Sequence, residues 1–196
     1  MKYGVGKDIC ICHKNADGTF TDDPRPYWEA MPLIKPGRYP DMDDKFDLYD
    51  DFYLRIRDRI FLIKKDFDYD AASIPKWAWS TIGHPMEMWI HLAALPHDGW
   101  YASHTVSQSE ADWLFLEILH ACDRATPLKS KWKAARALEE AGRWSRRNAC
   151  WAAVRAAGWA VYPKKKQDLE KYRALVEVIQ VPLEGLLTED PDDKEA

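Results

Sequence analysis

The chain has 196 residues, a formal net charge of −4, 46% hydrophobic residues and ten tryptophans. This length suits one substantial core better than two complete domains, and the apolar content excludes extensive disorder. No stretch approaches the roughly 18 apolar residues of a membrane span, and the N-terminus lacks the pattern of a signal peptide. We therefore expect a cytoplasmic protein with no membrane partner, a single domain over residues 1–182, and an acidic disordered tail over residues 183–196.

The first part of the chain predicts short strands joined by turns, because residues 1–45 are rich in Pro, Gly and Asp. Cys10 and Cys12 lack the spacing of a zinc knuckle, and the chain's four cysteines are too few for a disulfide framework, so reduced thiols are expected. Aromatic and β-branched residues then alternate up to Ile56 and form an apolar run over 60–63. This pattern favours two paired strands with a turn near residues 57–59.

From residue 85 the apolar period becomes helical, and one face holds Trp89, Leu92, Ala93, Pro96, His97 and Trp100. His97 should therefore point inward, and Pro96 should kink or end the helix because it lacks an N–H group. A second helix is expected from Ser107 to about Cys122, since "SQSE" has the capping-box pattern. Asp112 lies at the edge of its apolar face.

Three further helices are expected at about 129–141, 143–158 and 168–180, with Gly142 and Gly158 separating or ending them. Strands precede helices without alternating with them. The expected fold class is α+β, with N-terminal antiparallel strands followed by a helical C-terminal half.

The charge is uneven along the chain. Residues 124–166 hold 12 Lys/Arg against 2 Asp/Glu, and the remaining residues hold 16 against 30. Such asymmetry indicates a polyanionic partner or substrate, nucleic acid included. The alternative is that the basic helices dock on the chain's own acidic half or present a solvated face. The oligomeric state is left open.

Asp70, His97, Asp98 and Asp112 share one property, because each sits within or beside an apolar pattern, where an ionised carboxylate is costly unless it is paired. Carboxylates that converge need a cation or shared protons. A divalent ion, Zn²⁺, Mg²⁺ or Mn²⁺, would meet that need and could activate a water for hydrolysis. No P-loop, dinucleotide glycine pattern or serine elbow occurs, so no nucleotide cofactor is expected.

Each of these residues also has a structural interpretation. Asp70 and Ser73 can accept main-chain hydrogen bonds at a turn or helix start, and His97 can be a core histidine bonded to Asp112. Among the aromatic residues, Trp77, Trp79, Trp100 and Tyr101 could stack on a base or sugar ring, or simply fill the core.

Three stretches, "FDYDAASIPKW", "HLAALPHDGWY" and "SQSEADWLFLEIL", resemble the family known as domain of unknown function 1353. The resemblance covers about residues 48–122 and continues weakly to 160. Tyr69, Ala71 and Pro96 depart from the family's usual residues. The matching positions are Phe67, Asp70, Ala72, Ser73, Ile74, Pro75, Ala93, Ala94, His97, Asp98, Tyr101, Ala111, Asp112 and Phe115.

This resemblance implies a phage or prophage context, in the cytoplasm of a bacterial host or in a virion, but no settled activity. Our leading hypothesis is a phage-associated, metal-dependent hydrolase of a phosphoester, in a nucleotide or nucleic acid, or of an amide. Asp98 and Asp112 would be metal ligands with Asp70, His97 a ligand or general base, and Ser73 an orienting group. The alternatives are a non-catalytic virion or host-interaction protein with a structural Asp/His cluster, and a peptidoglycan hydrolase.

Overall fold

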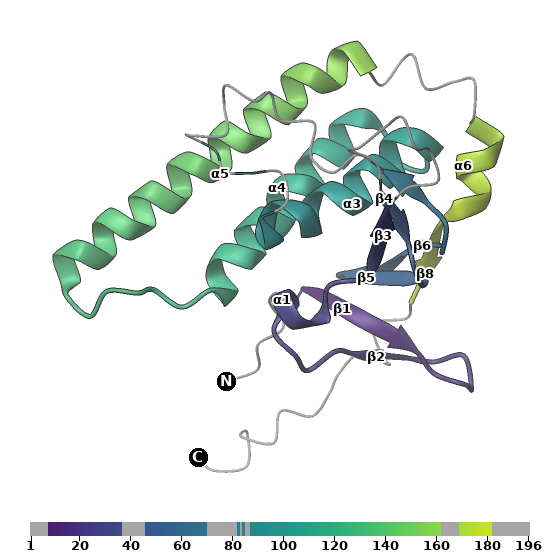
Figure 1. The fold of residues 1–196 in the computed structure, drawn as a ribbon, viewed down its shortest axis with the longest axis horizontal. Helices are drawn as coiled ribbons and strands as arrows, with labels where there is room; N and C mark the ends of the chain where they lie inside the picture. The colour runs from purple at the N-terminus through teal and green to yellow at the C-terminus, as the bar shows by residue number, and fades with distance from the viewer. Residues whose placement is uncertain are drawn as a thin grey trace.

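The structure, a computed structural model, describes residues 8–36, 46–69, 82, 84, 87–161 and 169–181. It has an antiparallel sheet built mainly from the N-terminal half, followed by helices, and the predicted α+β class is confirmed (Figure 1). The main sheet has the order β2-β1-β5-β6-β8, and a smaller sheet has the order β3-β4-β7. The main-sheet strands are β1 Ile9–Lys14, β2 Phe20–Asp22, β5 Phe52–Ile56, β6 Arg59–Ile63 and β8 Val176–Gln180.

The predicted strand pair is the hairpin of β5 and β6. Its register runs from Phe52 opposite Ile63 to Ile56 opposite Arg59. Arg57 turns the chain in the left-handed region, with φ of 55°. Nearly every hairpin residue is buried, because β1 covers one edge, β8 covers the other, and the helices pack on the sheet. The alternating pattern predicted this hairpin correctly.

The N-terminal segment forms short elements, as predicted. Helix α1 (Tyr27–Ala30) follows β2, and the small sheet joins β3 (Ile34–Pro36), β4 (Phe46–Leu48) and β7 (Asp68–Tyr69). All four cysteines are buried free thiols. The tail beyond residue 182 lies outside the described residues, so the expected disorder there and the single-domain prediction stay predictions.

Helix α3 (Met88–Ser103) corrects the expectation for Pro96, because it continues through the proline for seven more residues. A proline inside a helix costs about 3 kcal/mol. Most residues around it, from Ile90 to Ser103, are buried, and helix α4 (Gln108–Ala125) packs along α3. Tertiary burial on nearly all sides thus outweighs the local cost, and His97 points inward as predicted.

The start of α4 is as predicted, since Ser107 Oγ accepts a hydrogen bond from the main-chain N–H of Glu110 at 3.2 Å. The expected break at Gly142 is wrong. A single helix, α5 (Lys133–Val161), runs through both Gly142 and Gly158. Glycine within a helix costs only about 1 kcal/mol, which the packing of α5 on α4 can offset.

The expected helix over 168–180 is only half correct. Helix α6 (Leu169–Leu175) ends where β8 begins, and β8 pairs antiparallel with β6, from Val176 opposite Ile63 to Gln180 opposite Arg59. Valines and isoleucine fit a strand when a partner edge is available, and β6 offers that edge. The final described strand therefore completes a sheet whose other strands come from the first third of the chain (Figure 1).

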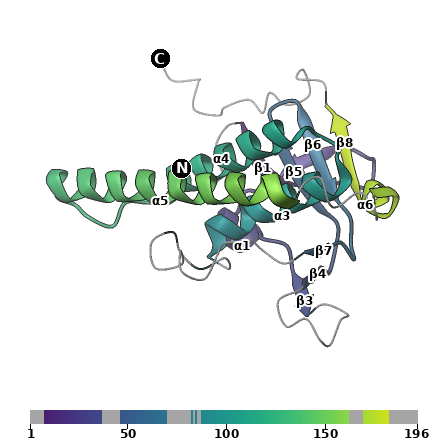
Figure 2. The ribbon, with the colours of Figure 1, turned by 90° about the horizontal axis from the view of Figure 1, so that it is seen from above.

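Viewed from above, α5 lies alongside α4, and its N-terminal half extends beyond the rest of the molecule (Figure 2). The core gathers residues from both sheets and from α3, α4 and α5. Among the described residues, no helix combines the length and the apolar character that a membrane span requires.

Candidate acid–base site on helix α3

The structure brings together three of the four predicted acidic and imidazole residues, with α3 supplying His97 and Asp98 and α4 supplying Asp112. Asp70, Ser73, Trp77 and Trp79 lie outside the described residues, so their proposed roles stay predictions. The site is therefore built here from α3, α4 and the elements that cover them.

Asp112 forms the buried centre of the cluster, with a side chain only 2% exposed. Its Oδ1 atom lies 3.1 Å from His97 Nε2 and accepts a hydrogen bond from the Tyr101 hydroxyl at 2.5 Å. Both donors come from α3, one helical turn apart, so α4 is tied to α3 through this one oxygen. A buried carboxylate requires such partners, because leaving it unpaired would cost several kcal/mol.

His97 lies between two carboxylates. Its Nε2 atom faces Asp112, while Nδ1 is 4.0 Å from Asp98 Oδ1, a distance that suits ion pairing but is too long for a hydrogen bond. Burial alone would lower the pKa of His97, but Asp112 and Asp98 outweigh burial and raise it above its ordinary value of 6.5. The imidazolium form therefore compensates the two nearby negative charges.

Asp98 differs from Asp112 in its partners. Its side chain is 15% exposed, yet its Oδ2 atom is buried and makes no hydrogen bond to any described residue. Buried polar atoms are normally satisfied, and exceptions concentrate at functional sites or where a water or ion binds. Asp98 Oδ2 is therefore the atom of this cluster that remains available for chemistry.

Two further residues lie within the electrostatic field of Asp98, namely His91 on α3 and Tyr69 on β7. The Tyr69 hydroxyl and His91 Nε2 are 2.5 Å apart, and both side chains are buried. Burial lowers the pKa of His91 more than the charge of Asp98 raises it, and burial together with Asp98 raises the pKa of Tyr69. A neutral imidazole and a neutral phenol thus share this hydrogen bond.

Neither His91 nor Tyr69 was among the site residues predicted from the sequence. A usable signal was present for His91, because it precedes Asp98 by seven residues, two helical turns on one face. No comparable signal identified Tyr69, since its contact with His91 joins the small sheet to α3. Only the tertiary fold brings these two residues together.

The aromatic residues of α3 have core roles in this structure. Trp100 is fully buried, and its ring meets Phe61 of β6 edge-on at a centroid distance of 4.8 Å. Tyr101 is also buried and positions Asp112. These contacts favour core packing over substrate stacking for both residues, which is the alternative that the sequence left open.

Helix α5 covers the site from outside. The Trp151 indole N–H donates to the main-chain oxygen of Asp112 at 2.9 Å. Gly158 faces Tyr101, and a Cβ atom there would lie 3.0 Å from two carbons of the tyrosine ring and closer still to its hydroxyl. The missing side chain of Gly158 therefore lets α5 approach the hydroxyl that holds Asp112.

The described residues contain no group of three or more His, Cys, Asp or Glu side chains placed to hold a metal ion. Asp112 Oδ1 already accepts from Tyr101 and faces His97, so it would serve a metal only if those contacts were rearranged. Asp98 Oδ2 is a buried carboxylate oxygen without a hydrogen-bond partner among the described residues. A metal on Asp98 would need further ligands from residues outside the described ranges, and Asp70 is the predicted one.

The region that carries the site matches a known protein family. Residues 46–135 match the family model described as "Protein of unknown function (DUF1353)", which confirms the predicted resemblance over this region. The match contains β4 to β7, α3 and α4, and therefore every described residue of the site except the covering residues of α5. No curated protein and no solved structure matches the chain.

Proposed function

We propose that the protein is a phage-associated hydrolase in which Asp98 is the reacting carboxylate, acting on a phosphoester or an amide bond. The observation that carries this proposal is the buried Asp98 Oδ2 atom, which has no hydrogen-bond partner among the described residues although His97 is held beside it. Asp112 Oδ1 and the Tyr101 hydroxyl bind each other, and Asp112 Oδ1 also binds His97, so these groups hold α3 and α4 together. Asp98 Oδ2 makes no such contact among the described residues.

In this proposal Asp98 is the general base. Its carboxylate takes a proton from a water molecule, and the water oxygen forms a bond to phosphorus or to the carbonyl carbon. The bond to the leaving oxygen or nitrogen breaks, and the leaving group takes the proton that Asp98 received from water and is released as an alcohol or amine. The His97 imidazolium stabilises the negative charge that develops beside it, and Asp112 holds the imidazole in place.

A divalent metal ion remains part of the proposal. Asp98 and Asp70 would be its carboxylate ligands, and the ion would lower the pKa of a bound water. Elemental analysis of protein purified without chelator is the direct test. About one equivalent of zinc, manganese or magnesium that falls in an Asp98→Asn variant would support a metal at this carboxylate.

The activity test compares Asp98→Asn with Asp123→Asn, because Asp123 is a partly buried α4 carboxylate that pairs with Arg147. Both variants would be screened with Mg²⁺, Mn²⁺ or Zn²⁺ against cyclic nucleotides, nucleic acids and peptidoglycan fragments. We expect Asp98→Asn to lower kcat by about 10²–10⁴-fold, with Asp123→Asn near the parent. Full activity in Asp98→Asn would contradict the proposed role.

The structure also gives an argument for a second candidate, a non-catalytic virion or host-interaction protein. His97 and Asp112 have side chains only 6% and 2% exposed, and their contacts join α3 to α4. A purely structural cluster predicts that His97→Ala and Asp112→Asn lower the melting temperature, while no substrate in the screen is turned over. Under the hydrolase proposal, Asp98→Asn lowers kcat by about 10²–10⁴-fold in a protein that is still folded at the assay temperature.

A further inference from the structure

The connection between α4 and α5, together with the first turn of α5, carries a basic surface that the site above does not use. We call residues 129–136 the hairpin tip. This segment lies at the end of α5 that extends beyond the rest of the molecule (Figure 2). Most of its residues are exposed. Most side chains of the hairpin tip therefore face solvent and do not pack in the core.

The basic residues of α5 divide into two groups. Arg143, Arg146 and Arg147 pair with Glu139, Glu87 and Asp123, so they dock the helix on the chain's own acidic groups. This part of the basic segment follows the self-docking alternative of the sequence analysis. The hairpin tip differs, because none of its basic side chains has an ion-pair partner among the described residues. They are Lys129, Lys131, Lys133 and Arg136.

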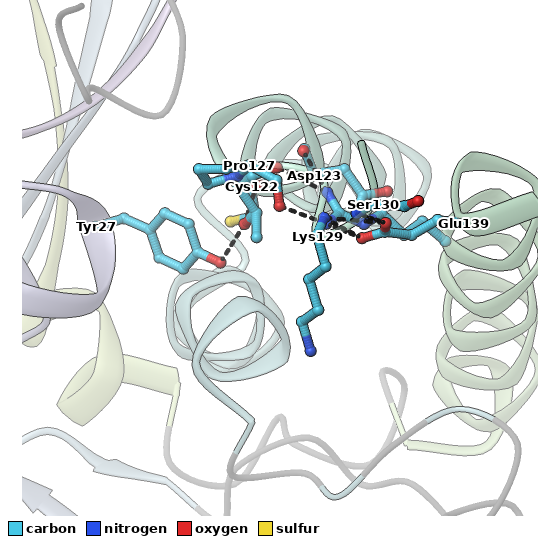
Figure 3. A network of polar contacts seen from close by, with 9 residues as sticks. Tyr27, Cys122, Asp123, Pro127, Lys129, Ser130 and Glu139 are labelled. Carbon is cyan, nitrogen blue, oxygen red and sulfur yellow. Dashed lines mark hydrogen bonds and ion pairs between the residues drawn. The ribbon is translucent and has the colours of Figure 1, made fainter. Parts of the chain in front are cut away.

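The loop that carries these cations is held firmly. The Glu139 carboxylate accepts the main-chain N–H groups of Lys129 and Ser130 at 3.0 and 3.4 Å, and Arg143 donates to the oxygens of Thr126 and Pro127 at 2.7 and 2.9 Å. Figure 3 shows this network, with the Lys129 side chain pointing away from it. The three remaining tip cations, together with Ala137 and Glu140, line a shallow hollow of about 360 Å³.

An exposed aromatic ring accompanies the cations. Trp132 is 79% exposed, stands between Lys131 and Lys133 in sequence, and has its main-chain N–H bound to Ser130 Oγ at 3.2 Å. An exposed aromatic ring beside cations that have no ion-pair partner in the described part of the chain is an arrangement that suits single-stranded nucleic acid. The ring stacks on a base, and the cations track the phosphates.

We propose that the hairpin tip binds a single strand of nucleic acid, with one base stacked on Trp132 and phosphates bound by Lys129, Lys131, Lys133 and Arg136. The exposed apolar residues argue against a bilayer as the partner. Leu138 and Trp144 are six residues apart on α5, which at about 100° per residue places them about 120° from each other, and Trp132 precedes the helix. A helix that lies in a membrane interface needs them on one face.

This inference is independent of the proposed hydrolase. Lys133 and Trp151, which contacts Asp112, are 18 residues apart on α5, or about 27 Å at 1.5 Å per residue. Binding at the tip should therefore survive Asp98→Asn, and loss of hydrolysis would not remove it. Failure of one proposal can thus be distinguished from failure of the other.

The test is fluorescence anisotropy with the full chain and labelled oligothymidylate or oligouridylate of about 20 nucleotides, longer than common single-strand site sizes. Four phosphate contacts predict a slope of about −2.8 for log K against log salt, at about −0.7 per contact. Lys133→Gln should reduce the magnitude of that slope by about 0.7. The matched control, Lys14→Gln on the exposed end of β1, should leave it unchanged.

Trp132→Ala should weaken binding about 5- to 150-fold, the range for loss of one base–aromatic contact. Trp144→Ala is its control, because Trp144 is an exposed tryptophan on α5 outside the hairpin tip. Equal effects of the two tryptophan variants, a duplex bound as tightly as a single strand, or an absence of binding at low salt would each overturn the proposal. So would binding to phosphatidylserine vesicles without binding to either oligonucleotide.

Discussion

Asp112 Oδ1 is a single buried oxygen that serves two donors, and the shorter contact is the one from Tyr101. A hydrogen bond to a charged group contributes about 1.5–3 kcal/mol to folding stability, and removing its donor costs more where the acceptor is buried away from water. The phenol of Tyr101 should therefore matter to the stability of the molecule even if it takes no part in chemistry.

We expect Tyr101→Phe to lower the free energy of unfolding by about 1.5–3 kcal/mol, measured by urea denaturation. Tyr53→Phe is the matched control, because its hydroxyl also donates to an aspartate, Asp51, but at 3.4 Å and in an exposed position. That change should stay within about 0.5 kcal/mol. Similar losses in the two variants would show that Asp112 does not depend on the phenol.

The position of His97 between two carboxylates predicts a pH dependence. Its pKa in the folded protein is raised above the ordinary value of 6.5, so the folded state binds the proton more tightly than the unfolded state does. The stabilisation is complete below about pH 6.5 and is lost as the pH rises through the raised pKa.

The measurement is the unfolding free energy of the parent and of His97→Gln between pH 5 and 9. The difference between the two proteins should be largest at the acidic end of this range and should shrink as the pH rises. A difference that grows with pH would mean that His97 is held neutral. His13, exposed beside Asp23, offers a control substitution, His13→Gln, away from the cluster.

For single residues, helical periodicity predicted that His97 points inward and placed Asp112 at the edge of an apolar face, with a bond between the two as one alternative. It did not predict the pairing of Tyr69 with His91 or the free oxygen of Asp98. Both depend on how β7 and α4 approach α3, and local pattern carries no information about that approach.

Among the elements, α5 contains a natural comparison of two glycines. A methyl group added at Gly142 would meet open space, whereas one added at Gly158 would meet the ring of Tyr101. We expect Gly142→Ala to stabilise the protein by about 0.5–1 kcal/mol through helix propensity. Gly158→Ala should destabilise it by about 1–3 kcal/mol, since the methyl group must displace the ring.

Thermal unfolding of the two variants is the measurement for this pair. Opposite shifts of the melting temperature are expected, and the loss in Gly158→Ala should be smaller when Tyr101 is already Phe, because the hydroxyl is the closest atom. A stabilised Gly158→Ala variant would mean that α5 does not approach α3 as closely as the structure shows.

The ends of helices were harder to predict from the sequence than the presence of the helices. Pro96 and Gly142 are local signals for helix ends, yet both lie inside helices, Pro96 in the buried middle of α3 and Gly142 at an exposed position of α5, where glycine costs only about 1 kcal/mol. The capping signal at Ser107 was reliable because the cap is itself a local hydrogen bond. A helix end that depends on a local hydrogen bond could be predicted from the sequence. A helix end signalled by Pro or Gly could not, because tertiary packing can outweigh the local preference.

Across the whole molecule, Arg143 joins the end of α4 to α5. Its guanidinium donates to the main-chain oxygens of Asp123, Thr126 and Pro127 and to the Glu139 carboxylate. Carbonyl oxygens at the end of a helix have no partner within it, so Arg143 acts as a cap supplied from another element.

Arg143→Gln should lower the unfolding free energy by at least about 1.5–3 kcal/mol and accelerate amide exchange over residues 126–140. Arg136→Gln is the control, an exposed arginine of the hairpin tip, and should stay within about 0.5 kcal/mol. Unchanged exchange in Arg143→Gln would show that the loop is held by Glu139 without the arginine.

The α+β class was predictable from the whole chain, because strand patterns fill its first third and helical periods follow. The strand order was not. β8 joins the sheet beside β6 after more than a hundred intervening residues, and its valines and isoleucine also fit a helical spacing. Only the open edge of β6 decides between those two states.

The hairpin of β5 and β6 has consequences for how the chain matures. Within the family-matched range, this hairpin has neither of its lateral neighbours, since β1 precedes the range and β8 follows it. During synthesis on the ribosome, the outer edge of β6 stays unpaired until residues 176–180, which form β8, have emerged. A nascent chain that stalls after α4 would thus expose the unpaired N–H and C=O groups of β6, which chaperones or other copies of the chain could bind.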